Sequence, residues 1–258
     1  MKKTGIKNYI KDRISDKAVL IVFITYVVLC LASAVYWCVN FDARSLAMSL
    51  LYVLLVPIIF LAEYMLKIKL GALYAAALMA LALGGILGTC YDLYTTIPFF
   101  DLLLHGASGI IFGGLGFVIA ERLFGLPNSN RAFVGCLIFA ICFSLAIAVV
   151  WEIFEYGCTT LLGLDMMEDT YVNSISSYVL AGTHAQTVEL NGITKTIIHY
   201  GNGQTFTING YLDLGLLDTL EDMIICTIGT AVFAVIVALS RSKFPKINKM
   251  LLPHVWEE

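Results

Sequence analysis

Residues 143–157 read FSLAIAVVWEIFEYG, an apolar run that carries two carboxylates, Glu152 and Glu155, near its end. The run is part of an apolar stretch over about 132–156, which is long enough to cross about 30 Å of hydrocarbon as a helix. Ionisable side chains are costly in lipid and usually face a bundle interior or a water-filled cavity. The stretch therefore predicts a membrane-spanning helix with a polar site near one of its ends.

The rest of the chain has the same apolar character. Of its 258 residues, 59% are hydrophobic and 14% are charged, whereas about a quarter of the residues are charged in soluble proteins. We expect one polytopic, all-α integral membrane domain over residues 1–258. Its six transmembrane helices are predicted at about 18–38, 46–66, 70–90, 102–120, 132–156 and 214–240.

The basic residues indicate how these helices cross the membrane. If the N-terminus lies in the cytoplasm, fourteen of the sixteen lysines and arginines fall on the cytoplasmic side, and only Arg44 and Lys195 fall outside. Cytoplasmic loops are enriched in lysine and arginine. We therefore predict a multi-pass protein of the cell membrane with both termini in the cytoplasm. The bases are interpreted as topology signals, so no nucleic-acid partner is expected.

Residues 157–213 form the one long connection and have a pattern of their own. Residues 187–198, TVELNGITKTII, alternate polar and apolar side chains around Asn191-Gly192, a pair typical of hairpin turns. Gly201-Asn202-Gly203 follows in the same style. We expect an extracytosolic loop with two to four short strands, including a β-hairpin at Asn191-Gly192, that covers the outer face.

Small residues and cysteines add two further expectations. Gly109 and Gly113 in the fourth span have the G-x-x-x-G spacing that lets helices approach closely in lipid. The seven cysteines have no C-x-x-C spacing and so give no metal or redox motif. Cys38, Cys90 and Cys158 lie near the predicted outer edge, and a disulfide between two of them is left open.

Ionisable residues gather at one end of three predicted helices. Spacings of three or four residues place both members of a pair on one helix face. The pairs are Asp101 and His105, Glu152 and Glu155, and Asp218 and Asp222. At the opposite end, Glu63 precedes Lys67 by four residues and Glu121 adjoins Arg122, so we expect these two acids to have local basic partners.

Five carboxylates at one depth repel one another unless they are protonated, hydrated or bound to a cation. Carboxylates and a histidine on facing helices are the ligands with which helix bundles hold divalent metals. We therefore predict a site for Mn²⁺, Fe²⁺, Mg²⁺ or Zn²⁺, because oxygen ligands with one nitrogen suit all four ions. Its predicted ligands are Asp101, His105, Glu152, Glu155, Asp218 and Asp222.

Simpler roles exist for some of these residues. Asp101 can cap the fourth helix, and Asp213 or Asp218 can cap the sixth, because an aspartate at a helix N-terminus accepts backbone N–H groups. His105 alone can be an ordinary interfacial histidine. Capping cannot explain Glu152 and Glu155, since they end a helix, where the macrodipole disfavours negative charge.

Three motifs resemble those of the YjdF-like bacterial inner-membrane proteins, a functionally uncharacterised family. They are Asp101-x-x-x-His105-x-x-x-Gly109, Glu152-x-x-Glu155 and Asp218-Thr219-x-x-Asp222-Met223, and they cover the fourth to sixth spans. The order of the motifs is also similar, more weakly, to that of VanZ-like membrane proteins, which are associated with glycopeptide-antibiotic resistance. Neither resemblance implies a settled reaction; both imply a shared site.

Three functions follow from this reading. The first is a metal-dependent enzyme that acts on a lipid or lipid-linked substrate in the outer leaflet, with Glu152 and His105 as catalytic residues. The second is a proton or cation transporter whose vestibule holds the same acids. The third is a non-catalytic membrane protein with a structural ion. Membrane lipids are the expected partners, and the sequence leaves the substrate, the metal and the oligomeric state open.

Overall fold

The computed structural model describes residues 5–243 and 252–255 of the chain. These residues form two compact units, Met1–Ala148 with Asp222–Glu258 and Val149–Glu221. Helix α8 (Asn130–Leu162) leads from the first unit into the second, and helix α10 (Leu216–Lys243) leads back. Each unit is described separately.

The first unit is almost entirely helical. Besides parts of α8 and α10 it contains α1 (Ile6–Ser15), α2 (Lys17–Val39), α3 (Ala43–Val53), α4 (Leu55–Leu66), β1 (Ile68–Lys69), α5 (Ala72–Tyr91), α6 (Leu93–Thr96), α7 (Phe100–Phe124) and β8 (His254–Val255).

Six helical segments in the described part of the chain are long and apolar enough to cross a membrane. They are Lys17–Val39, Ala43–Leu66, Ala72–Tyr91, Phe100–Phe124, Asn130–Leu161 and Leu216–Arg241. The prediction of an all-α, multi-pass membrane protein is therefore confirmed. Which side of the membrane holds the termini stays a prediction, and residues 1–4 and 256–258 lie outside the described residues.

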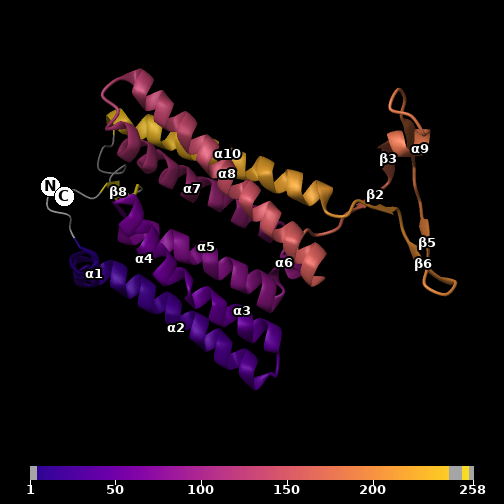
Figure 1. Ribbon diagram of the computed structural model, residues 1–258, viewed down its shortest axis with the longest axis horizontal. Coiled ribbons are helices and arrows are strands. Elements are labelled where there is room, and N and C mark those ends of the chain that lie inside the picture. Colours follow the sequence, from indigo (N-terminus) through magenta and orange to yellow (C-terminus); the bar gives the residue numbers. More distant parts are fainter. Residues whose placement is uncertain (1–4, 244–251, 256–258) are drawn as a thin grey trace. The chain divides into compact units, whose positions relative to one another are not determined.

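The helices of the first unit run side by side. Helix α2 packs against α3 and α5, and α5 packs against α7 (Figure 1). Phe23, Tyr26 and Met79 lie in the apolar core between these helices. The outer faces are apolar too. In the second span, for example, only 11% of an apolar stretch of 18 residues is buried, so most of its apolar side chains lie on the surface. Such a surface matches the hydrocarbon of a bilayer.

The second span is interrupted between α3 and α4. Helix α3 ends at Val53, Leu54 forms a turn, and α4 begins at Leu55. Pro57 explains the break, because a proline ring clashes with the carbonyl four residues earlier, which here belongs to Val53. The span predicted as one helix is thus two consecutive helical pieces.

Helix α1 is fixed to the end of α4 by buried polar groups. The Glu63 carboxylate accepts a hydrogen bond from the Tyr9 hydroxyl and lies 2.9 Å from Nε of Arg13. The same carboxylate accepts a 2.6 Å hydrogen bond from the Leu70 amide, and Arg13 donates to the Leu70 carbonyl at 3.1 Å. Arg13 is 4% exposed and Glu63 is 1% exposed.

The expected pairing of Glu63 with Lys67 is therefore wrong. Lys67 has a left-handed backbone conformation, with φ 55°, at the C-cap of α4. This turn takes its side chain off the helix face that carries Glu63, and its ammonium lies 4.3 Å from the centre of the Tyr64 ring. The partner of Glu63 comes from α1 instead.

The chain returns to this end of the bundle after α10. Strand β8 pairs antiparallel with β1, and Val255 lies opposite Ile68. Ile68 and Leu252 are both buried in the core cluster around Phe117 and Phe233. This short sheet was not predicted, because two-residue strands leave no periodic signal.

Glycines allow α7 and α10 to approach within backbone contact. A Cβ atom on Gly109 would lie 2.1 Å from the carbonyl oxygen of Cys226, and one on Gly229 would lie 2.1 Å from that of Gly106. Both distances are shorter than any real contact. The close helix approach predicted for Gly109 is thus present, with α10 as the partner.

Buried hydroxyl groups join α7, α8 and α10 at the same level. The Thr230 hydroxyl donates to the Gly109 carbonyl at 3.0 Å and lies 2.9 Å from the Ser144 hydroxyl. Ser144 also lies 3.6 Å from Sγ of Cys226. Thr230 and Ser144 are both 0% exposed, so these bonds form in a dry environment.

The second unit carries most of the strands. They are β2 (Tyr171–Val172), β3 (Ser174–Ser177), β4 (Val188–Asn191), β5 (Thr196–Tyr200), β6 (Gln204–Ile208) and β7 (Tyr211–Leu212), with the short helix α9 (Tyr178–Ala181) after β3. They form antiparallel pairs β2–β7, β3–β4 and β5–β6.

Of the two turns that the sequence indicates, Gly201–Gly203 closes a hairpin and Asn191-Gly192, where we placed the β-hairpin, does not. Strands β5 and β6 turn at Gly201–Gly203, where Tyr200 lies opposite Gln204. Strand β4 ends at Asn191 but pairs with β3, and the chain then continues, with the Ile193 amide bonded to the Asn173 carbonyl at 2.7 Å. The long-range partner β3 therefore outweighs the local turn preference of Asn191-Gly192.

All seven cysteines are free thiols. Cys38 is exposed, and Cys90 is buried in the first unit, where its thiol approaches the Ser45 carbonyl at 3.8 Å. The disulfide that the sequence left open is therefore not formed in this structure.

Replacing Gly109 with alanine is expected to destabilise the bundle by about 1 to 3 kcal/mol, the usual cost of overpacking. The new methyl group would meet backbone atoms of α10, which cannot move without shifting the helix. The measurement is unfolding in detergent followed by circular dichroism. Gly135→Ala is the matched control, because nothing lies within 4 Å of a Cβ at that position of α8. Equal effects of the two substitutions would contradict the prediction.

Replacing Glu63 with glutamine is expected to lower the free energy of unfolding by about 3 to 5 kcal/mol, because Arg13 would be left buried without its counter-charge. Asp12→Asn, which breaks the exposed pair with Lys69, should cost less than about 1 kcal/mol. The double variant Arg13→Gln with Glu63→Gln should lose less than the sum of the single variants. Additive losses in the same unfolding assay would refute a coupled pair.

Candidate metal site

Asp101, His105 and Asp222 come together in the first unit. Nε2 of His105 lies 3.6 Å from Oδ1 of Asp101 and 3.5 Å from Oδ2 of Asp222. One ligand atom from each residue lies within 4.8 Å of the others. His105 is 8% exposed and Asp222 is 1% exposed, so two of the three side chains are buried. The structure thus joins residues from two of the three predicted pairs.

Local structure aims these side chains at one another. Phe99 has a left-handed conformation, with φ 64°, and α7 begins directly after it, so Asp101 lies in the first turn of α7. His105 follows one turn later on the same face. Asp222 lies in the second turn of α10, four residues before Cys226, whose carbonyl marks the close contact with Gly109. The contact between Gly109 and Cys226 therefore also brings His105 on α7 close to Asp222 on α10, one helical turn before the contact.

The separations suit a metal ion. Protein nitrogen and oxygen ligands lie about 2.0 to 2.2 Å from ions such as Zn²⁺, so two ligands of one ion lie about 3 to 4.4 Å apart. The two measured separations fall inside this range, and the upper limit of 4.8 Å lies slightly above it. Small side-chain rotations would bring all three atoms within bonding distance. A histidine with two carboxylates leaves all four predicted ions, Mn²⁺, Fe²⁺, Mg²⁺ and Zn²⁺, as candidates.

A band of hydroxyl and thiol groups lies next to this cluster and was not predicted as part of it. Ser108 donates to the His105 carbonyl at 2.8 Å and lies 3.9 Å from Sγ of Cys226. The available signal was helical spacing, because Ser108 follows His105 by three residues, and Cys226 and Thr230 follow Asp222 by four and eight.

Glu152 and Glu155 belong to the second unit, near the end of α8. Both are 7% exposed, which is unusual for glutamates. Their spacing of three residues places them on one face of the helix, as expected. Their assignment as ligands, and that of Glu152 as a general base, stays a prediction.

Asp218 and Asp213 have different local roles in the second unit. Asp218 lies in the first turn of α10 and is partly exposed. Asp213 accepts hydrogen bonds from the amides of Leu217 at 2.9 Å, Gly215 at 3.2 Å and Thr170 at 2.9 Å. Of the two aspartates that the sequence offered as caps for this helix, Asp213 is the one with these bonds.

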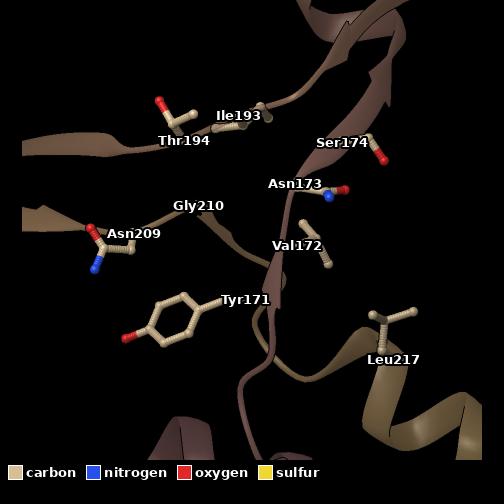
Figure 2. A pocket seen from close by; sticks show the side chains of 9 residues that line it. All are labelled: Tyr171, Val172, Asn173, Ser174, Ile193, Thr194, Asn209, Gly210 and Leu217. Atoms are coloured by element: carbon tan, nitrogen blue, oxygen red, sulfur yellow. The ribbon is translucent and has the colours of Figure 1, made fainter.

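A hollow of about 660 Å³ in the second unit is lined by residues of 171–174, 193–194, 209–210 and Leu217. In Figure 2 the side chains of Tyr171 and Asn209 extend to one side of the strand, and those of Asn173 and Ser174 extend to the other. Ligand sites need polar groups that converge on one point. The hollow therefore offers less for a ligand than the Asp101–His105–Asp222 cluster.

The comparisons with known proteins give one match. The family model described as "Predicted membrane protein (DUF2238)" matches residues 18–243, which include all three cluster residues and, apart from Lys17, all six membrane-spanning segments. No curated protein and no solved structure matches the chain.

Asp213 makes the stability of the second unit depend on pH. Burial raises the pKa of its carboxyl, but hydrogen bonds from the Thr170, Leu217 and Gly215 amides outweigh burial and hold the pKa below its usual value. A lowered pKa in the folded state adds stability above the unfolded-state pKa of about 4, and this stability is lost as the pH falls through the folded-state pKa.

We expect Asp213→Ala to cost about 1 kcal/mol near neutral pH, as the loss of a helix cap usually does. This cost should shrink as the pH falls below about 4, because the wild-type carboxyl then becomes protonated. Amide hydrogen exchange at Thr170, Gly215 and Leu217, compared between variant and wild type at each pH, measures it. Asp165→Ala, at an exposed position of the same unit, is the control. A cost independent of pH would contradict the assignment.

Proposed function

The chain belongs to the family of predicted membrane proteins (DUF2238), and from this premise we propose that it binds a divalent metal ion through Asp101, His105 and Asp222. One observation carries the proposal. Nε2 of the buried His105 lies 3.6 Å from a carboxylate oxygen of Asp101 and 3.5 Å from one of Asp222, and neither distance is that of a good hydrogen bond. A cation between these three groups would compensate the two negative charges in a site of low dielectric.

We further propose that the bound ion serves chemistry on a lipid or lipid-linked substrate. Such an ion polarises a phosphoryl or carbonyl oxygen, or lowers the pKa of a water molecule. Asp222 and His105 would hold it, and Asp101, at the more exposed end of the cluster, lies where a substrate could enter. On the sequence pattern alone, we also propose Glu152, Glu155 and Asp218 as ligands. Glu152 would in addition act as the general base. The resemblance to the YjdF-like family is consistent with a shared site.

The packing beside the cluster favours this proposal over transport. A proton or cation crossing the membrane needs a polar path along the whole bundle. Beyond Thr230 on α10, the next turns bring Phe233 and Val237, 5% and 1% exposed. The Phe233 ring packs against that of Phe117, with ring centres 6.3 Å apart. This apolar layer blocks the direct route between α7 and α10.

The test is metal analysis of the purified protein. We expect about one Mn, Fe, Mg or Zn ion per chain after purification without chelator, or after loading with each ion. Asp222→Asn and His105→Gln should lower metal affinity at least tenfold, since even residues that only support ligands contribute about 10- to 100-fold. The matched controls are Asp165→Asn and His184→Gln, at exposed positions.

Several outcomes distinguish the alternatives. No metal in any preparation, or full affinity in both cluster variants, would overturn the proposal. Loss of metal together with loss of the fold would favour a structural ion. Loss of affinity in Glu152→Gln, Glu155→Gln or Asp218→Asn would add that residue to the ligands. Lipid vesicles incubated with metal-loaded protein and analysed by mass spectrometry should show a product that Asp222→Asn does not form.

A further inference from the structure

A groove lies in the first unit at the end of the bundle that also holds α1. Its volume is about 300 Å³, at the lower end of the range of small-molecule sites. The last residues of α4, the turn after it and the last two turns of α7 line it: Met65, Leu66, Lys67, Ile119, Arg122 and Leu123. This groove takes no part in the proposed metal site, which lies at the opposite end of α7.

The lining has two chemically distinct parts. Lys67 and Arg122 are its two charged residues, and both are cations. The other four are apolar, and Met65 and Leu123 are 70% and 64% exposed. A ligand that fits both parts carries a negative charge and a long apolar segment.

The position of the groove relative to the membrane selects such a ligand. The second apolar segment ends at Leu66 and the fourth at Phe124, so we expect Lys67 and Arg122 to lie near the boundary between hydrocarbon and headgroups. Met65, Ile119 and Leu123 lie next to these cations, toward or at the ends of the spans. Basic pockets between transmembrane helices on the cytoplasmic side, where the charge pattern predicts that both cations lie, bind the headgroups of anionic lipids.

Two acids lie near these cations in the sequence. Glu63 is four residues before Lys67, but its carboxylate accepts hydrogen bonds from Tyr9 and Leu70 and pairs with Arg13. Glu121 directly precedes Arg122, but the ion pair expected between them is not present in the described part of the chain, where Glu121 is partly buried and Arg122 is exposed. The ends of α4 and α7 add the negative ends of two helix dipoles, so we expect both cations to contribute to binding a phosphate.

We propose that this groove binds an anionic phospholipid, with its phosphodiester between Lys67 and Arg122 and its acyl chains along Met65 and Leu123. We propose a lipid rather than free phosphate because a lipid also covers the exposed apolar side chains of Met65 and Leu123. The cations also have a simpler role, since lysine and arginine complement helix C-termini and mark membrane topology. That role predicts no preference among lipids, so the two readings can be separated.

Native mass spectrometry of the whole protein, titrated with phosphatidylglycerol or phosphatidylcholine, tests the proposal. Each basic residue near a headgroup contributes about fivefold in affinity, so wild-type protein should prefer phosphatidylglycerol by about tenfold or more. The double variant Lys67→Gln with Arg122→Gln should lose this preference. Arg44→Gln with Lys195→Gln removes the same charge elsewhere and should keep it.

Equal binding of the two lipids by wild-type protein would overturn the proposal. So would a preference that survives the Lys67→Gln, Arg122→Gln double variant. A lower melting temperature of that variant with unchanged lipid preference would assign both residues to helix capping alone. Displacement of phosphatidylglycerol by excess inorganic phosphate would identify a free-anion site instead of a lipid site.

Discussion

Backbone contact between α7 and α10 is the constraint on which the first unit and its cluster depend. Gly109 and Gly229 each meet a carbonyl oxygen of the other helix, at distances that leave no room for a side chain. Helices in lipid gain little from burying apolar surface, so close van der Waals contact and interhelical hydrogen bonds must hold them. Thr230 and Ser144 supply those hydrogen bonds at the same level. Asp101, His105 and Asp222 meet because this contact fixes the two helix faces.

This arrangement explains why a costly group of charges is tolerated. The cluster lies near one end of the bundle, and apolar residues follow it toward the centre. Within the cluster the Asp101 side chain is the most exposed, at 21%, and that of Asp222 the least, at 1%. The most costly charge to bury is therefore that of Asp222, which lies next to the His105 imidazole. The polar groups at the other end, around Glu63, are instead joined in a closed set of partners.

The sequence predicts the helices well because apolar length is a strong signal in membrane proteins. It also selects Asp101, His105 and Asp222, since ionisable residues at one depth are rare enough to be compared between helices. It misses what depends on contacts between distant segments. Arg13 replaces Lys67 as the partner of Glu63 because a left-handed turn redirects the lysine, and strand β3 takes β4 away from the expected hairpin. Ser108 and Cys226 gain a polar role only through the helix contact.

The pairing of Arg13 with Glu63 also bears on how the protein is made. Tyr9 and Glu63 are 54 residues apart, so α1 and the first span are synthesised well before their buried acidic partner. Arg13 can therefore act as a topology signal in the nascent chain, while its charge still faces water and lipid headgroups. In the folded chain the same side chain is buried against Glu63 and Leu70. Arg13 is thus both one of the basic residues from which the cytoplasmic N-terminus is predicted and a buried partner that joins α1 to the end of α4.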